Sequence, residues 1–303
     1  MANIREIKSR IQSIQDTMKI TNAMYMISQT KLRKAKRSLD ETEEYFITLQ
    51  NMMDRILRHL PDVENKYFDK RPKKAPSERV TGIIAVTADK GLAGAYNHNV
   101  IRLAERELSQ RGKCRLFIVG EVGRRYFANK GVEIAEEFKY TAQNPTLHRA
   151  RIISETVIDE FLRGELDEVY IIYTGMRNGM VSDNESVKLL PMGFEAENDV
   201  MKAAHMASEK LKLVPGPDEV INNIVPDIIS GYVYSTLVEA FCAEQSARML
   251  AMESANNNAG SMIHDLSIEY NRVRQALITQ EITEVIAGAK AQKKKKARKV
   301  QEA

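Results

Sequence analysis

Cysteine is scarce in this sequence, tryptophan is absent, and no long apolar run occurs. Cys114 and Cys242 are the only cysteines among 303 residues. They form no CxxC motif, so we expect a reducing compartment and two small, buried hydrophobic side chains. No stretch free of Asp, Glu, Lys and Arg exceeds eleven residues, whereas about 20 apolar residues are needed to span a bilayer. With no apolar signal segment at the start, we expect neither secretion nor insertion into a membrane by this chain alone.

The side chains that carry catalysis or bind metals are also sparse. Five histidines occur singly, without metal-ligand spacing or a paired nucleophile, so no catalytic constellation is evident. They are His59, His98, His148, His205 and His264. We therefore expect no catalytic residue, no metal site and no cofactor among them.

Glycine and proline are missing from the first 60 residues, which predicts one unbroken helix about 90 Å long. Apolar and small residues recur there in alternating steps of four and three, the heptad pattern of a coiled coil. The predicted seam contains Ile4, Ile7, Ile11, Ile14, Met18, Thr21, Tyr25, Ser28, Leu32, Ala35, Leu39, Thr42, Phe46, Leu49, Met53, Ile56 and Leu60. Thr21, Ser28, Ala35 and Thr42 dilute its middle, so that section is expected to associate more weakly or to face something else.

A second helix is predicted from 217 to 289, and it supplies the partner that the first helix needs. Its seam contains Val238, Cys242, Gln245, Met249, Met252, Asn256, Ala259, Ile263, Leu266, Tyr270, Val273 and Leu277. Two helices that leave one central domain must return along each other, so they should be antiparallel. At equal rise, paired residue numbers sum to about 277, which places Ile4 near Val273. Beyond about Leu277 the second helix should project alone, and Pro226 and Gly231 should bend its start.

Between the two helices, short apolar runs alternate with amphipathic ones, which predicts a Rossmann-like α/β domain with a largely parallel sheet. The predicted strands are Val80–Thr87, Cys114–Gly120, Val132–Ala135 and Glu168–Gly175, with an edge strand at Glu185–Leu190. The predicted helices are Ala95–Gln110, Val122–Asn129 and Leu147–Arg163. The segment Met192–Leu213 is compatible with either a loop or a short helix. The predicted fold class is thus α/β plus a long antiparallel coiled coil.

Positive charge is concentrated in two places although the formal net charge is only +4. The first cluster is Lys31, Arg33, Lys34, Lys36 and Arg37. The second lies in 290–303, where like charges disfavour a continued helix and predict a mobile tail. Such blocks are solvated faces or docking sites for acidic surfaces, and a scaffold that binds nucleic acid through them is the alternative function.

The loop from Thr87 to Gly94 joins the first predicted strand to the next helix, where some α/β proteins bind phosphate. Gly91 and Gly94 form neither GxGxxG nor GxxxxGK[ST], so a tight structural turn is favoured over a nucleotide site.

Short motifs stand out at both ends of the chain. Ile4–Ile11 reads Ile-Arg-x-Ile-Lys-x-Arg-Ile, Lys19–Met26 reads Lys-Ile-Thr-x-Ala-Met-x-Met, and Ile278–Glu281 reads Ile-Thr-x-Glu, followed by Glu284, Gly288 and Ala289. Together these motifs resemble the N-terminal helix and the C-terminal signature of the gamma subunit of the F-type rotary ATP synthase. The loop Thr87–Gly94 is similar to that family's Ser-Thr-Asp-Lys/Arg-Gly-Leu-Cys-Gly, with Ala88 and Ala93 as departures. The tail after Ala289 is a larger departure from the family pattern.

The resemblance implies a rotor shaft that turns inside alpha and beta subunits and rests on the epsilon subunit and the membrane c-ring. It implies a peripheral position on the cytoplasmic side of a bacterial cell membrane, a coupling role in proton- or sodium-driven ATP synthesis, and no nucleic acid partner. The implied contacts with neighbouring subunits are Met24, Arg274, Gln275, Thr279, Glu281 and Glu284. The cluster Lys31, Arg33, Lys34, Lys36 and Arg37 is expected to meet acidic loops of the beta subunits.

The predicted organisation has five parts. They are an N-terminal coiled-coil helix at 1–60, a linker at 61–77, a central α/β domain at 78–216, a C-terminal coiled-coil helix at 217–289 and a basic tail at 290–303.

Overall fold

The computed structural model describes residues 4–59, 65–68, 74–75, 78–138, 142–177, 180–192 and 213–301. The chain forms two compact units, one of residues 1–26 with 252–303 and one of residues 27–251. Helices α1 (Ile4–His59) and α6 (Pro217–Gln301) contribute to both. Most of the predicted linker and of the undecided segment Met192–Leu213 lies outside the described residues.

Unit 27–251 contains a five-stranded sheet in the order β3-β2-β1-β4-β5. Its strands are β1 (Val80–Val86), β2 (Lys113–Val119), β3 (Ile134–Phe138), β4 (Glu168–Arg177) and β5 (Met180–Leu190). The first four run parallel, and β5 pairs antiparallel with β4 at one edge. The predicted parallel sheet with an edge strand is confirmed, although β5 begins earlier than the predicted Glu185.

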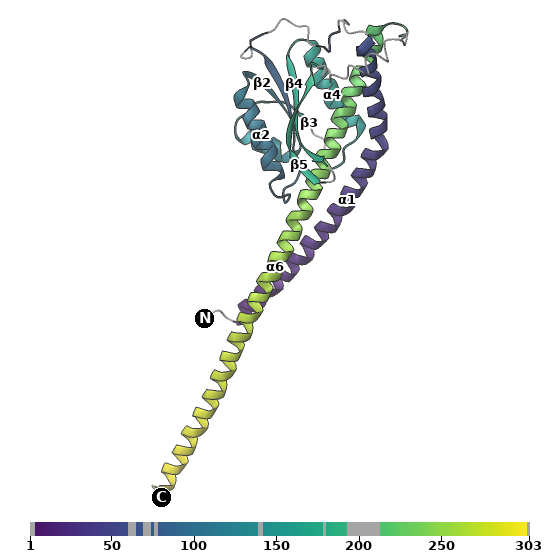
Figure 1. The fold of residues 1–303 in the computed structure, drawn as a ribbon. Helices are drawn as coiled ribbons and strands as arrows, with labels where there is room; N and C mark the ends of the chain where they lie inside the picture. Colours follow the sequence, from purple (N-terminus) through teal and green to yellow (C-terminus); the bar gives the residue numbers. More distant parts are fainter. Residues whose placement is uncertain are drawn as a thin grey trace. The chain divides into compact units, whose positions relative to one another are not determined.

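Helices cover both faces of this sheet (Figure 1). Helices α2 (Tyr96–Gln110) and α3 (Glu121–Asn129) pack over Ile83 and Ala85 of β1. Helix α4 (Leu147–Leu162) lies with the long helices over Ile84 and Val86. Successive side chains of a strand point to opposite faces, so this apolar strand builds both cores.

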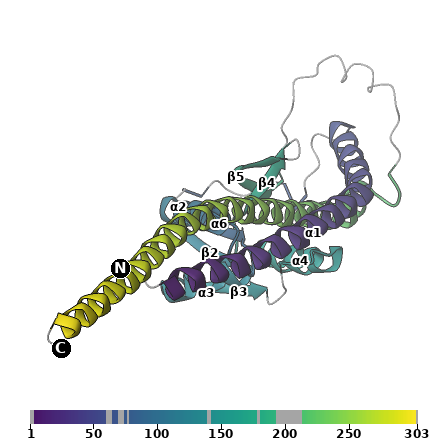
Figure 2. The same cartoon turned by 90° about the horizontal axis from the view of Figure 1, so that it is seen from below.

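The long helices belong to the same core as the sheet in this unit, and they run side by side there (Figure 2). Met53 and Ile56 of α1 are each 2% exposed. The ring centroids of Phe46 in α1 and Tyr234 in α6 lie 6.2 Å apart. A β-carbon built on Gly231 of α6 would lie 2.0 Å from the Cδ1 atom of Phe46. Apolar residues of both long helices therefore form part of the core of the sheet in this unit.

Small residues in the middle of the α1 seam are not turned outward. Ser28 and Ala35 are 2% and 7% exposed, so both side chains are buried within the protein. Small side chains let packed elements approach closely, which is compatible with their burial. The expectation that they face elsewhere is wrong for these two positions.

The other unit is a two-helix coil followed by a single helix. Along α1, Ile4, Ile7, Ile11, Ile14, Met18, Thr21, Met24 and Tyr25 are buried or half-buried, and every other residue between 5 and 23 is exposed. The Thr21 hydroxyl hydrogen-bonds to the Asn256 side-chain oxygen across the coil. The numbers 21 and 256 add to 277, as do those of Phe46 and Gly231 in the other unit, so the antiparallel pairing and its register are confirmed.

The basic tail departs from its predicted conformation. Helix α6 continues without a break to Gln301, beyond the predicted end at 289. The repulsion of like charges costs only a few tenths of a kcal/mol per pair. Ala, Lys, Gln and Arg, which dominate this segment, are among the strongest helix formers, and their propensity outweighs that repulsion.

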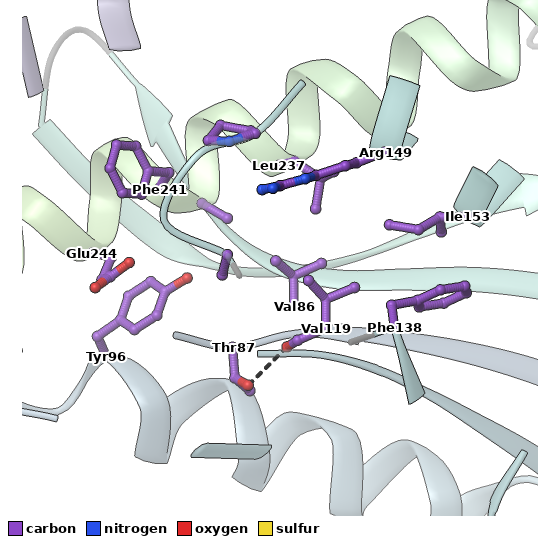
Figure 3. Close-up of a pocket in the computed structure, with 13 residues that line it drawn as sticks. Val86, Thr87, Tyr96, Val119, Phe138, Arg149, Ile153, Leu237, Phe241 and Glu244 are labelled. Atoms are coloured by element: carbon purple, nitrogen blue, oxygen red, sulfur yellow. Dashed lines mark hydrogen bonds between the residues drawn. The ribbon is translucent and has the colours of Figure 1, made fainter. Parts of the chain in front are cut away.

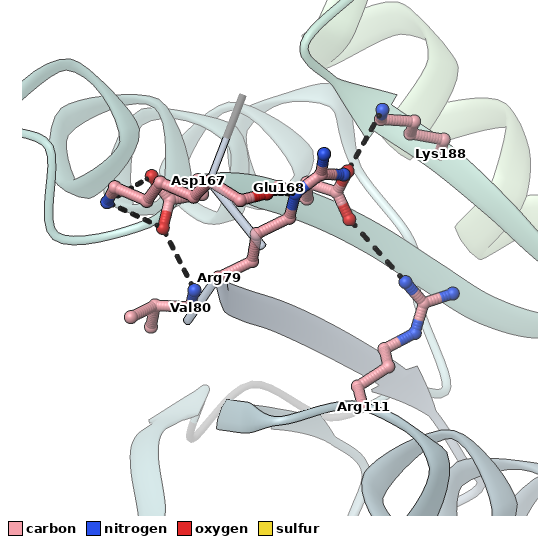
Figure 4. A network of polar contacts seen from close by, with 7 residues as sticks. Arg79, Val80, Arg111, Asp167, Glu168 and Lys188 are labelled. Atoms are coloured by element: carbon pink, nitrogen blue, oxygen red, sulfur yellow. Dashed lines mark hydrogen bonds and ion pairs between the residues drawn. The ribbon is translucent and has the colours of Figure 1, made fainter. Parts of the chain in front are cut away.

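A polar network closes the amino end of the sheet (Figure 4). The Glu168 carboxylate, 9% exposed as a residue, lies 2.8 Å from Arg79, 3.4 Å from Lys188 and 3.6 Å from Arg111. Its neighbour Asp167 accepts the backbone N–H of Val80 at 2.9 Å. These contacts tie the start of β1 to the start of β4 and neutralise cations from three elements.

Replacing Glu168 with glutamine should lower the free energy of unfolding by about 1 to 3 kcal/mol, less than for a fully buried pair because the three cations are partly exposed. The change keeps the shape of the side chain but leaves Arg79, Lys188 and Arg111 without their shared anion. Urea denaturation followed by circular dichroism measures the loss. Glu155→Gln, at an exposed position of α4, is the matched control and should unfold like the parent; equal stability of both variants would contradict the role assigned to the network.

Candidate functional site

The end of α6 is a helix without a covering element among the described residues. From Arg274 to Gln292 every residue is exposed, which matches the predicted projection beyond the coil (Figure 1). Leu277 itself, placed in the predicted seam, is 42% exposed and does not take part in it. Apolar side chains remain uncovered further along, namely Ile278, Ile282, Val285 and Ile286 at 43 to 71% exposure. A lone helix with so many exposed apolar residues is typical of a binding surface.

Polar residues of the predicted site are interleaved with these apolar ones. At steps of three and four, Arg274 and Glu281 share a helix face with Ile278 and Val285. Gln275 and Thr279 share the next face, where the Thr279 hydroxyl donates to the Gln275 carbonyl at 2.9 Å.

The remaining member of this set, Glu284, accepts a hydrogen bond from the Gln280 amide at 2.9 Å. The structure thus gathers Arg274, Gln275, Thr279, Glu281 and Glu284 on one exposed segment.

Met24 lies on α1 in the same compact unit. It is half-buried beside Tyr25 of the seam, so its side chain reaches the edge of the coil, as predicted. Part of the Met24 side chain is therefore open to solvent at this edge.

Members of the predicted basic cluster on α1 have different surroundings. Lys31 and Lys34 line a groove of about 460 Å³ together with Asn144, Val238 and Phe241. Arg37 donates instead to the Glu41 carboxylate at 3.0 Å on the exposed surface. The groove therefore brings together two of the five cluster residues.

The loop after β1 is a tight turn whose polar groups bind one another. The Asn97 side chain accepts the Ala88 N–H at 2.8 Å, and Asp89 accepts the Glu121 N–H at 3.3 Å. Both N–H groups are already bonded to side chains, so neither is open to a phosphate. This geometry supports the predicted structural turn over a nucleotide site.

Gly120, at the start of α3, is required by the same turn. Its φ is +94°, and a β-carbon there would lie 2.1 Å from the Thr87 carbonyl oxygen.

Comparison with known proteins decides the family. The family described as ATP synthase matches residues 3–292. The ATP synthase gamma chain of Ruminiclostridium cellulolyticum is 43% identical over 291 residues, covering 95% of this chain and 98% of the relative. The chain belongs to the ATP synthase gamma chain family.

Other gamma chains show the same full-length similarity. The sodium ion specific gamma chain of Acetobacterium woodii is 36% identical over 302 residues, with 95% and 98% coverage. A chain in the cryo-EM structure of the Euglena gracilis mitochondrial ATP synthase, OSCP/F1/c-ring, shares the fold at a TM-score of 0.64 and 15% identity, covering 95% of this chain and 94% of that one.

In this gamma chain, the loop Thr87–Gly94 makes a contact with α6 that was not predicted from the sequence. This loop is called the signature loop below. Arg248 of α6 is 7% exposed; it pairs with Glu244 at 2.6 Å and donates to the Gly91 carbonyl at 3.1 Å. The spacing Glu-x-x-x-Arg was a visible signal of an ion pair. Its burial and its contact with a distant loop were not visible in the sequence.

Beside Glu244 lies a cavity of about 20 Å³, room for one water molecule, at the carboxyl ends of β1, β2 and β3 (Figure 3). Its walls are apolar except where Tyr96, Thr87, Arg149 and Glu244 reach it. Burial raises the pKa of the Glu244 carboxyl, and the nearby Arg248 opposes this shift. Burial also raises the pKa of Tyr96, so its hydroxyl stays protonated.

Both cysteines are free thiols; Cys242 is buried, as predicted, whereas Cys114 is only half-buried. Across the described ranges, no group of three or more His, Cys, Asp or Glu residues is placed to hold a metal ion. Within the same ranges, no helix has the length and apolar character needed to cross a membrane.

Proposed function

We propose that this chain is the central-stalk rotor shaft of an F-type ATP synthase. It couples rotation of a membrane c-ring to ATP synthesis and hydrolysis at the beta subunits. Membership of the gamma chain family supports this role, as does the exposed end of α6, which carries both apolar and charged residues. The chain itself breaks no bond in this proposal, and the catalytic sites belong to its partners.

The mechanism depends on asymmetric contacts. As the shaft turns, the faces that carry Arg274, Gln275 and Thr279 meet successive beta subunits. A face that contacts one beta conformation more strongly than another stabilises that conformation, which links shaft angle to nucleotide affinity. Glu281 and Glu284 extend the same surface, and Met24 adds a contact at the edge of the coil.

The proposed partners are the alpha, beta and epsilon subunits and the c-ring. The coil would stand within the alpha and beta subunits, and the α/β part would contact epsilon and the ring. The complex would place the chain peripherally on the cytoplasmic side of a bacterial cell membrane. The coupling ion is left open between protons and sodium ions, since a relative specific for sodium is 36% identical.

The observation that carries the proposal is the bare end of α6, because a helix so apolar requires a surrounding protein surface. The test is to express the chain with alpha, beta and epsilon subunits and the membrane sector that accompany it, and to isolate the complex. We expect a complex that hydrolyses ATP and pumps ions only when this chain is present. Coupled pumping without it would refute the proposal.

Within this function, Lys31 and Lys34 are expected to bind an acidic segment of a beta subunit in their groove. Changing both to glutamine should weaken the salt dependence of ATP hydrolysis by the complex, because the screened attraction is lost. The matched control is the change of Arg33 and Arg37 to glutamine. It removes the same number of positive charges but leaves the residues that line the groove unchanged. Equal effects of the two double variants would show that the groove has no special role.

A further inference from the structure

Arg248 of α6 forms a buried ion pair with Glu244 of the same helix and hydrogen bonds to the loop Thr87–Gly94. The Glu244 and Arg248 side chains are 3% and 9% exposed. The Arg248 guanidinium also donates from Nη2 to the carbonyl oxygens of Lys90 at 3.3 Å and Gly91 at 3.1 Å. Below, Glu244, Arg248 and these two carbonyl groups are called the α6 latch.

The loop held by the latch is strained and split between a buried and an exposed side. Ala88 and Ala93 are 0% and 1% exposed and pack with Ala243 of α6. Leu92, between them, has a φ of +62° and is 65% exposed. A non-glycine residue in the left-handed region persists only where surrounding contacts hold it there. The latch provides such contacts at the carbonyl groups of Lys90 and Gly91, the two residues that precede Leu92.

The latch also occupies a special position in the sheet. The chain leaves β1 toward β2 on one side, while β4 lies on the other side of β1. In doubly wound sheets, this switch point at the carboxyl ends of the strands is where ligands bind. Here a side chain of α6 is bonded to the loop at that point.

This bond differs physically from the apolar contacts around it. Apolar packing is non-directional and resists turning of a helix only through the fit of its side chains. Charge-assisted hydrogen bonds from a planar guanidinium have fixed directions, and burial strengthens them. The latch therefore opposes rotation of α6 about its own axis relative to the loop.

We propose that Arg248, held by Glu244, is a positioning residue that fixes the loop 87–95 on α6 so that the α/β part and α6 turn together. The proposal depends on the rotor function proposed above. In this proposal, torque passes between α6 and the α/β part through the latch as well as through apolar packing.

The first experiment tests the latch in the isolated full chain. Glu244→Met with Arg248→Met removes both charges together, which avoids leaving one buried and unpaired. We expect backbone amides of residues 90–95 to exchange hydrogen about tenfold faster than in the parent. The control is Asp159→Met with Arg163→Met, an exposed pair of the same spacing on α4. Unchanged exchange in the loop of the latch variant would overturn the proposal.

The second experiment uses the assembled complex. The latch variant should retain ATP hydrolysis but pump fewer ions per ATP, by about threefold or more, whereas the α4 control should match the parent. Arg248→Lys keeps the charge but replaces the planar guanidinium by a compact ammonium group on a flexible stem, so it should fall between them. Faster loop exchange with full pumping would refute the role in torque. A parent complex that fails to couple would refute the rotor function and leave the exchange result standing.

Discussion

Gly231→Ala is expected to lower the free energy of unfolding by about 1 to 3 kcal/mol, the cost of overpacking a closely packed core. The added methyl group would lie 2.0 Å from Cδ1 and 2.2 Å from Cε1 of Phe46. The ring cannot move away freely, because it also packs against Tyr234. Either α1 must shift from α6 or the Phe46 ring must leave its place. Urea denaturation followed by circular dichroism suits a chain that lacks tryptophan.

Gly260→Ala is the matched control for this change. A β-carbon at Gly260 meets nothing within 4 Å, and alanine is the better helix former by about 1 kcal/mol. It should therefore leave stability unchanged or raise it. Combining Gly231→Ala with Phe46→Ala should recover part of the loss caused by the methyl group, which a double-mutant cycle would reveal. Gly231→Ala with parental stability would contradict the close packing of the two helices.

Met24→Lys is expected to impair coupling strongly while leaving assembly intact. Met24 is half-buried at the edge of the coil, so a lysine there can extend its ammonium group away from the seam and keep its stem against the apolar surface. In the proposed complex that ammonium group would meet a beta subunit. We expect ions pumped per ATP to fall several-fold, with hydrolysis changed by no more than about twofold.

Met24→Leu serves as the control for the lysine variant, since it preserves the apolar character and nearly the volume of the side chain. The complex with leucine should pump like the parent. Purified complexes of equal subunit content are needed, so that lost assembly is not mistaken for lost coupling. Unchanged pumping by the lysine variant would show that Met24 makes no coupling contact.

The long helices and their register were predictable because their determinants are local and periodic. Steps of four and three, without glycine or proline in α1, predict a straight partner pair of equal rise. Thr21 with Asn256 and Phe46 with Gly231 both satisfy the predicted sum of 277. The strand order was not predictable, since parallel strands are paired by tertiary contacts that no local pattern records.

Two features of the site show where sequence reasoning stopped. The exposed end of α6 followed from comparing helix lengths, and the structure leaves Arg274 and Glu281 exposed there. The latch did not follow, because Arg248 bonds to backbone carbonyl groups, and a carbonyl group has no sequence signature. The tail was mispredicted because weak charge repulsion was weighed above strong helix propensity.

Rotation is the central claim, and single-molecule observation of the assembled complex tests it most directly. Glu133→Cys on the exposed surface of the α/β part, combined with Cys114→Ser, provides one accessible thiol for a gold particle, because Cys242 is buried. With alpha and beta subunits fixed to a surface, ATP should drive the particle in one direction, with one pause in each turn for every beta subunit of the complex. A particle that stays at one angle while the complex hydrolyses ATP would contradict the rotor assignment.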